Sequence, residues 1–224
     1  LRMIEDSALE GIDEIYGWHN WPAIPEGQLV CPDGIVMCGN GTFEITVNGQ
    51  GGHASQPELC RDPVLAGSAM VQALQQVVAR RLAPQQTAVL SVTSFNAPGG
   101  PTVIPQQAVL GGSIRVPNST TREQINALIV EVVENTAHAY GVSAEVTIEP
   151  RYNATINHAA QAGKLRAAWR AVMGDAAFDV ATPVPIMASE DFSYYLQEIP
   201  GAFALVGAGK KGEEPVPCHS PFYD

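Results

Sequence analysis

Two histidines in proline-containing segments are the residues best suited to metal chemistry in this sequence. His19 lies in the run Gly-Trp-His-Asn-Trp-Pro, and His219 lies near the other end of the chain in Pro-Cys-His-Ser-Pro-Phe. We predict that each imidazole ends a strand-like run and is held by rigid neighbouring backbone, an arrangement that aims a histidine at a metal ion. No His-x-x-x-His, Glu-x-x-His or Cys-x-x-Cys motif accompanies them, so the sequence supplies only part of a coordination shell.

Three further segments carry side chains suited to catalysis or substrate binding. His53 lies in a mobile glycine-rich loop, where an imidazole could donate to a developing oxyanion, although a surface histidine in a flexible turn fits the loop equally well. Arg115 lies in an apolar strand and suits a carboxylate partner, while a charge on an edge strand would also oppose aggregation. Glu190 belongs to the run Ser-Glu-Asp-Phe, where helix capping alone would explain the polar residues.

The composition excludes several classes of protein. The 224 residues include 12 Lys+Arg and 23 Asp+Glu, a formal net charge of -11, which argues against the basic surface that a nucleic-acid partner requires. No apolar run approaches the roughly 20 residues of a membrane span, and no basic segment followed by an apolar core opens the chain. We therefore expect a cytoplasmic protein with neither nucleic acid nor membrane as a partner. The four cysteines lack regular spacing, so we expect reduced thiols.

The elements that position these side chains fall into two groups. Residues 41–152 form a self-consistent set in which alternating apolar residues predict strands and apolar stripes predict helices. The predicted order is strand 42–47, helix 63–81, strands 87–95 and 108–116, helix 120–140 and strand 143–149. The first helix is expected to have Asp62 as its N-cap, and the second to begin with a capping box at Thr120 and to end at Gly141. This β-α-β-β-α-β order is the ferredoxin-like split motif, with two helices on one face of the sheet and the middle strands as antiparallel neighbours.

The flanking segments are expected to form a single α/β domain that the first group interrupts. They contain a short strand over 12–19, a helix over 164–173 and an apolar strand over 203–209. Neither flank is long enough to build a core by itself. We therefore predict an incomplete metal-binding domain from residues 1–40 and 153–224, and a lid or dimerisation domain from residues 41–152.

The order of the motifs resembles that of the binuclear metallo-amidohydrolases, the aminoacylase, hippurate hydrolase and auxin-conjugate hydrolase group of the carboxypeptidase-like metallopeptidases. The resemblance covers essentially the whole chain. It rests on six runs: Gly17-Trp18-His19-Asn20-Trp21-Pro22, Gly51-Gly52-His53-Ala54-Ser55 with Asp62-Pro63, Val103-Ile104-Pro105, Gly112-Ser113-Ile114-Arg115, Ser189-Glu190-Asp191-Phe192 and His219-Ser220-Pro221-Phe222.

The resemblance implies a role for each candidate residue. In that family two divalent ions (zinc, manganese or cobalt) share a water molecule, and a glutamate takes the proton of that water before it attacks the amide carbon. His19 and His219 correspond to metal ligands. His53 corresponds to a lid histidine that reaches the site of a partner subunit and steadies the tetrahedral oxyanion, and Arg115 to a lid arginine that binds the substrate carboxylate. Glu190 corresponds to a segment that lines the substrate pocket. The implied substrate is an N-acyl amino acid, and the implied assembly is a homodimer formed through the lid.

Two departures from the family pattern bear on function. Thr102 stands where the family usually has asparagine before Val-Ile-Pro, so a hydroxyl replaces an amide among the expected substrate-binding groups. The family's Cys-Gly-His-Asp-x-His segment and its catalytic glutamate pair would precede Leu1, and Met3-Ile4-Glu5-Asp6 resembles the helix that follows that pair. We therefore expect the chain to be a fragment with little activity, whose parent hydrolyses N-acyl amino acids. The alternative is a non-catalytic dimerisation or amino-acid-binding module, which would have no need of His19 and His219.

Overall fold

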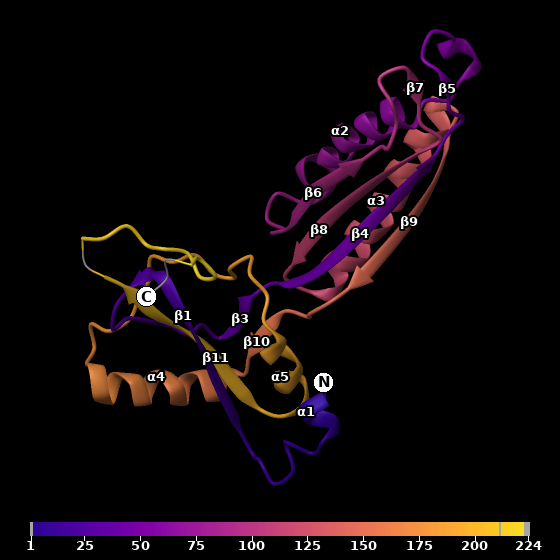
Figure 1. Ribbon diagram of the computed structural model, residues 1–224. Helices are drawn as coiled ribbons and strands as arrows, with labels where there is room; N and C mark the ends of the chain where they lie inside the picture. Colours follow the sequence, from indigo (N-terminus) through magenta and orange to yellow (C-terminus); the bar gives the residue numbers. More distant parts are fainter. Residues whose placement is uncertain (1, 211, 222–224) are drawn as a thin grey trace. The chain divides into compact units, whose positions relative to one another are not determined.

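The computed structural model describes residues 2–210 and 212–221, and these residues belong to two compact units (Figure 1). We call residues 40–151 the inserted unit. The split unit combines residues 1–39 with residues 152–224, so that the chain contributes to it twice. Leu1 and Phe222, which belong to the predicted N-terminal helix and to the second histidine run, lie outside the described residues.

A four-stranded sheet forms the inserted unit. Its strands are β4 (Gly39–Asn48), β6 (Val89–Asn96), β8 (Gln107–Val116) and β9 (Ser143–Pro150), in the spatial order β6-β8-β4-β9. The pairs β6–β8 and β4–β9 are antiparallel. With the two helices that separate these strands in the sequence, the order is β-α-β-β-α-β. The predicted ferredoxin-like architecture is therefore confirmed, as is the antiparallel pairing of the two middle strands.

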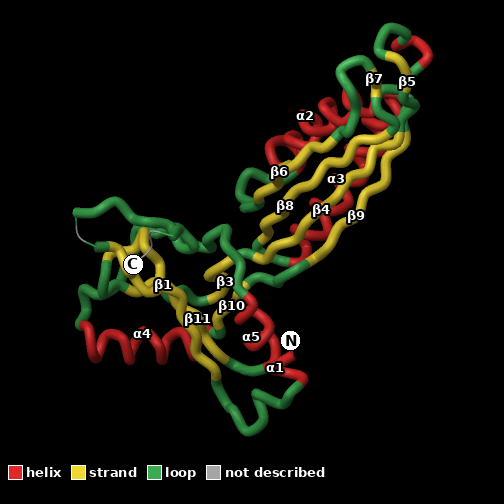
Figure 2. Tube along the Cα trace, viewed as in Figure 1, coloured by secondary structure: helices red, strands yellow, loops and turns green. Residues whose placement is uncertain are grey.

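Two long helices, α2 (Pro63–Arg81) and α3 (Ser119–Tyr140), cover one face of this sheet (Figure 2). Their apolar stripes and the inward residues of the strands bury one continuous core, because period-2 and period-3.6 patterns both present one apolar face. The sheet fits this core closely at Gly112 on β8. A Cβ there would lie 2.1 Å from Cζ of Phe43, so only glycine leaves room for that ring.

The helix termini follow the predicted chemistry with one exception. Oδ1 of Asp62 accepts hydrogen bonds from the N–H groups that open α2, and α3 ends at Gly141 in the left-handed conformation at φ 67°. The capping box predicted at Thr120 is wrong, because the N-cap of α3 is Asn118, whose Oδ1 accepts from the Thr121 N–H at 2.8 Å. An asparagine two residues earlier competes well for this position, since it is among the strongest N-cap residues.

A short antiparallel pair of strands, distant from each other in the sequence, lies at one end of the inserted unit (Figure 1). β5 (Gly52–His53) pairs antiparallel with β7 (Val103–Ile104), with His53 opposite Val103, and the one-turn helix η1 (Pro57–Leu59) follows β5. The glycine-rich segment was predicted as a loop throughout. Its central residues instead have backbone partners that are distant in the sequence, which a local pattern cannot reveal.

The split unit is built on a three-stranded sheet in the order β1-β11-β2. Its strands are β1 (Ile15–Pro25), β2 (Leu29–Val30) and β11 (Gly201–Gly209). β1 and β11 are parallel, and His19 lies opposite Leu205. The strand predicted over 12–19 therefore continues to Pro25, and His19 lies in the middle of it rather than at its end. A second, two-stranded sheet pairs β3 (Gly34–Met37) with β10 (Thr155–Asn157).

Helices complete the split unit. α4 (Ala159–Met173) packs against β11, and two short helical turns, η2 (Asp191–Tyr194) and α5 (Tyr195–Glu198), lead into that strand. α1 (Arg2–Glu5) lies at the start of the described chain. None of the described helices combines the length and the apolar character needed to cross a membrane.

Candidate active site

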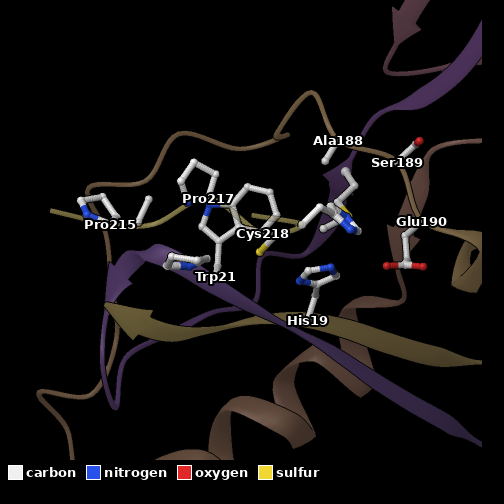
Figure 3. Close-up of a pocket in the computed structure, with 12 residues that line it drawn as sticks. His19, Trp21, Ala188, Ser189, Glu190, Pro215, Pro217 and Cys218 are labelled. Carbon is white, nitrogen blue, oxygen red and sulfur yellow. The ribbon is translucent and has the colours of Figure 1, made fainter. Parts of the chain in front are cut away.

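A cavity of about 430 Å³ lies beside β1 in the split unit (Figure 3). Most of its lining is apolar, and the side chains that could take part in chemistry come from β1, from the segment before η2 and from the segment after β11. The cavity is lined by His19, Trp21, Pro22, Ala23, Met37, Ala188, Ser189, Glu190, Pro215, Pro217, Cys218 and His219. It therefore brings together three residues predicted from the sequence: His19, Glu190 and His219.

The side chain of His19 is oriented by its own backbone. Nδ1 lies 2.6 Å from the carbonyl oxygen of Asn20, and because that oxygen only accepts, Nδ1 must carry the proton. The neutral imidazole then has its lone pair on Nε2, the atom available to a metal ion. A backbone carbonyl that receives Nδ1–H is the usual means by which a ligating histidine is oriented. The ring of Trp21 packs edge-on at a centroid distance of 5.7 Å and helps to fix the imidazole plane.

Glycine at position 17 brings the Glu190 segment against β1. A Cβ on Gly17 would lie 2.7 Å from Cε2 of Phe192, so the ring of Phe192 occupies the place of a side chain. That ring also packs on Phe203 and Tyr195 at centroid distances of 5.2 and 5.6 Å. Two of the sequence runs, Gly-Trp-His and Ser-Glu-Asp-Phe, are thus joined by one glycine–aromatic contact, which places Glu190 on the wall of the cavity that His19 also lines.

Glu190 lies in a partly desolvated position. Its Oε1 accepts a hydrogen bond from the Asp191 N–H at 3.1 Å, so the capping role considered from the sequence does occur. Burial raises the pKa of the Glu190 carboxyl, and the hydrogen bond from the Asp191 N–H opposes that shift. Capping and a functional role are compatible here, because the carboxylate caps η2 while it lines the cavity.

The segment that carries His219 is attached to β1 through its cysteine. Sγ of Cys218 donates to the carbonyl oxygen of Asn20 at 3.5 Å, the same oxygen that accepts from His19. His219 has a positive φ of 68°, which is uncommon for a residue other than glycine, and such backbone occurs often at functional sites. His219 was predicted to end a strand, but it lies in a turn beyond the end of β11. Sequence reasoning also passed over Cys218, although it is the immediate neighbour of His219.

The inserted unit holds the other candidates, and it groups two of them. His53 on β5 and Thr102, which precedes β7, are neighbours because the Ala54 N–H donates to the Thr102 carbonyl oxygen at 2.9 Å. Both side chains are exposed. They form a pair of potential hydrogen-bond donors at the end of the sheet where β8 begins (Figure 1).

Arg115 lies at the opposite end of the same sheet. It is half-buried near the end of β8, opposite Val89 on β6, whereas the His53 segment is bonded to the start of β8 through Gln106, whose Oε1 accepts from the Gly51 N–H at 2.7 Å. Eight strand residues at about 3.3 Å each separate the two ends of β8 by about 25 Å. Within one inserted unit, His53 and Arg115 are therefore too far apart to contact one small substrate.

The described residues supply part of a metal centre. The Nε2 lone pair of His19 suits a divalent ion, yet among residues 2–210 and 212–221 no three or more His, Cys, Asp or Glu side chains are grouped to hold one. The expectation that a glutamate pair occurs only before Leu1 is wrong as to sequence, because the chain contains the adjacent pair Glu213-Glu214. Both glutamates are exposed, and neither lines the cavity.

Known proteins similar to this chain match nearly all of it but are about twice as long. Residues 37–141 match the family model of the peptidase dimerisation domain of the M20 family. An IAA-amino acid hydrolase of Arabidopsis thaliana is 33% identical over 230 residues, covering 100% of this chain and 52% of that protein. An N-acetyl-L-cysteine deacetylase of Bacillus subtilis is 34% identical over 206 residues, covering 92% of this chain and 49% of that protein. The chain thus spans about half the length of these relatives.

Solved structures give the same assignment. A dinuclear metal-binding peptidase of the M20 family from Bacillus subtilis superposes with a TM-score of 0.73 at 26% identity, covering 92% of this chain and 51% of that protein. Because 92% of the chain is covered, the match extends to both units. The resemblance drawn from the six sequence runs is confirmed: residues 37–141 match the M20 peptidase dimerisation domain, and the chain is similar over nearly its whole length to proteins named as amidohydrolases and to an M20 family peptidase.

Proposed function

We propose that this chain is part of an amidohydrolase that removes the acyl group from N-acyl amino acids with the help of divalent metal ions. The observation that carries the proposal is the orientation of His19, whose Nδ1–H is bound to backbone and whose Nε2 lone pair is free in a mainly apolar cavity. The relatives named as an IAA-amino acid hydrolase and an N-acetyl-L-cysteine deacetylase support this substrate class. A solved relative titled as dinuclear metal-binding supports the cofactor.

In this proposal the split unit contributes to the metal centre and the acyl pocket. His19 and His219 would hold metal ions together with ligands from a segment that precedes Leu1. Bound divalent ions would supply an activated water and polarise the amide carbonyl. The apolar wall around Trp21 and Met37 would exclude bulk water and receive the acyl group, and Glu190 would line the same pocket.

The inserted unit would complete the site from two subunits. Arg115 would bind the free carboxylate of the substrate, since a guanidinium matches a carboxylate in two hydrogen bonds. His53, with Thr102 beside it, would donate to the oxyanion. Because His53 and Arg115 lie about 25 Å apart along one sheet, we assign the His53 that serves a given site to the partner subunit of a homodimer. The matched peptidase dimerisation domain supports this assembly.

The activity is tested on the full-length protein with its upstream half and metals. A panel of N-acetyl, N-benzoyl and indole-acetyl amino acids should include at least one substrate, while the 224-residue chain alone should be inactive. His19→Ala should lower kcat/KM by more than about 100-fold, since even the outer partners of metal ligands contribute 10- to 100-fold. His138→Ala, which removes an exposed histidine of α3, is the matched control and should not change the rate. Failure of the full-length protein on the whole panel would refute the proposal.

Subunit mixing tests the shared site. His19→Ala and His53→Ala each inactivate the enzyme, but a mixed dimer has one site with both histidines intact. Equal mixing should therefore restore about a quarter of the wild-type activity, since half of the dimers are mixed and one of their two sites is complete. No recovery after confirmed subunit exchange would place His53 in the site of its own subunit or outside the mechanism. Zinc binding that is insensitive to His19→Ala in the full-length protein would favour the alternative of a non-catalytic module.

A further inference from the structure

The side chain of His53 is held by a residue two positions further along the chain. Its Nδ1 lies 3.1 Å from the backbone nitrogen of Ser55 and 2.7 Å from Oγ of the same serine. Both groups approach the same ring nitrogen, which leaves the Nε2 edge of the ring turned away from this contact.

The backbone contact shows which ring nitrogen carries the proton. A backbone N–H can only donate, so Nδ1 of His53 must accept and therefore has the lone pair. The Ser55 hydroxyl, which can donate or accept, then donates as well. A neutral imidazole that accepts at Nδ1 has its proton on Nε2. His53 is thus the opposite tautomer of His19, whose Nδ1 donates to a carbonyl oxygen.

The surrounding backbone holds the serine in register with the histidine. The Gln56 N–H donates to the His53 carbonyl oxygen at 2.9 Å and closes a tight turn around Ala54 and Ser55. The adjacent β5–β7 pairing and the bond from the Ala54 N–H to the Thr102 carbonyl oxygen anchor this turn to the neighbouring segment. The contact between Ser55 and His53 is therefore part of a bonded turn rather than a chance approach of two exposed side chains.

We propose that Ser55 is a positioning residue that keeps His53 in the Nε2–H tautomer, so that the free edge of the imidazole presents a hydrogen-bond donor to the oxyanion of the substrate. The inference rests on the proposed function for the identity of the acceptor, but not for the tautomer. A histidine free to exchange its proton would spend part of its time with a lone pair facing the oxyanion, which repels the developing negative charge. A hydroxyl that donates to Nδ1 disfavours the tautomer with its lone pair on Nε2, so the donor is already in place before the reaction begins.

The tautomer is measured on the 224-residue chain, without any activity. Two-bond proton–nitrogen correlations of the ¹⁵N-labelled imidazoles, recorded at about pH 9 where an ordinary imidazole is neutral, distinguish Nδ1–H from Nε2–H. His53 should show a larger Nε2–H fraction than His138, an exposed histidine of the same unit. Ser55→Ala removes the hydroxyl but keeps the backbone N–H, so it should reduce that excess in part, and Ser55→Thr, which keeps both donors, should retain it. An Nδ1–H signal for His53, or an unchanged signal in Ser55→Ala, would overturn the inference.

The kinetic consequence is measured on the full-length enzyme. Ser55→Ala should lower kcat by about 3- to 10-fold, the worth of one hydrogen bond, with KM nearly unchanged, and Ser55→Thr should restore most of the rate. The same change in a His53→Ala background should have no further effect, because the serine acts only through the histidine. Ser68→Ala is the matched control, since that hydroxyl donates only to the Leu65 carbonyl oxygen within α2.

The two proposals fail in different ways. An enzyme without activity on any substrate refutes the proposed function and leaves the tautomer measurement intact. An active enzyme in which Ser55→Ala matches the wild type in kcat refutes the positioning role of Ser55, whatever the substrate.

Discussion

Replacing Gly17 by alanine should destabilise the split unit through a single contact. The added methyl group would lie 2.7, 3.0 and 3.0 Å from three atoms of the Phe192 ring, where carbon atoms in good contact are about 3.5–4.0 Å apart. The ring cannot simply move away, because it packs on Phe203, which is buried, and on Tyr195. Overpacking of this kind costs about 1–3 kcal/mol, and the reduced freedom of the unfolded chain returns about 0.4–1 kcal/mol. We expect a net loss of about 1–2 kcal/mol.

Tryptophan fluorescence during urea unfolding measures this loss of stability specifically in the split unit. Trp18, Trp21 and Trp169 are the only tryptophans of the sequence, and all three belong to the split unit. Gly163→Ala is the matched control, since a Cβ there meets nothing nearer than Arg166 Nη2 at 4.0 Å. In the middle of α4 that change should stabilise the unit by up to about 1 kcal/mol, so the two glycine substitutions should have opposite signs.

A double-mutant cycle with Phe192→Leu isolates the contact between position 17 and the Phe192 ring. In Phe192→Leu the smaller side chain leaves room for the methyl group, so the cost of Gly17→Ala should largely disappear, giving a coupling of about 1–2 kcal/mol. If Gly17→Ala stabilises the unit as the control does, or costs the same in both backgrounds, the close approach of Gly17 and Phe192 is not what fixes the position of the Glu190 segment.

Two further predictions concern titratable groups of the split unit. A hydrogen bond from Lys164 is the largest of the causes that lower the pKa of Glu14 to about 2, so this carboxylate contributes stability above its ordinary value of 4.5 and loses it as the pH falls through about 2. Glu14→Gln should therefore be less stable than the wild type at pH 7 by urea unfolding, and the difference should shrink as the pH is lowered towards 2. A difference that does not shrink would contradict the ion pair. Burial raises the pKa of the Cys31 thiol to about 11, so iodoacetamide at pH 8 should modify the half-exposed Cys218 and spare Cys31, as peptide mass spectrometry would detect. Equal labelling rates would mean that Cys31 is not buried in solution.

The sequence was most informative where structure is determined by neighbouring residues. The strand through Phe43, Ile45 and Val47 and the helix through Ile125 and Val132 have strict periods, and the inserted unit follows from them. The predicted strand ended at residue 19, whereas β1 continues to Pro25. Its second half contains proline, and it is a strand because it pairs with β11, which is distant in the sequence. The β5–β7 pair was missed for the same reason.

For the candidate site, the sequence predicted the residues but not their hydrogen-bond partners. Residue types and motif order identified His19, Glu190 and His219, and the structure places all three on one cavity. The sequence could not show which nitrogen of each histidine carries a proton, because a tautomer depends on whether a carbonyl or an N–H lies beside Nδ1. Ser55 is part of the His53 sequence run, but only the structure shows that its hydroxyl contacts Nδ1 of His53.

The close approach of the two ends of the inserted unit has a consequence for the order of folding. The Arg151 N–H donates to the Asn40 carbonyl oxygen at 3.0 Å, so the folded inserted unit begins and ends at nearly the same point. β1 and β11 must pair across 186 residues of chain (201 − 15), of which 112 belong to the inserted unit (151 − 39). If the inserted unit folds first, the loop to be closed shrinks to 74 residues (186 − 112), which lowers the entropic cost of closure by about 0.8 kcal/mol. That difference corresponds to about fourfold faster pairing of β1 with β11. Early folding of the inserted unit would therefore speed formation of the sheet that contains His19.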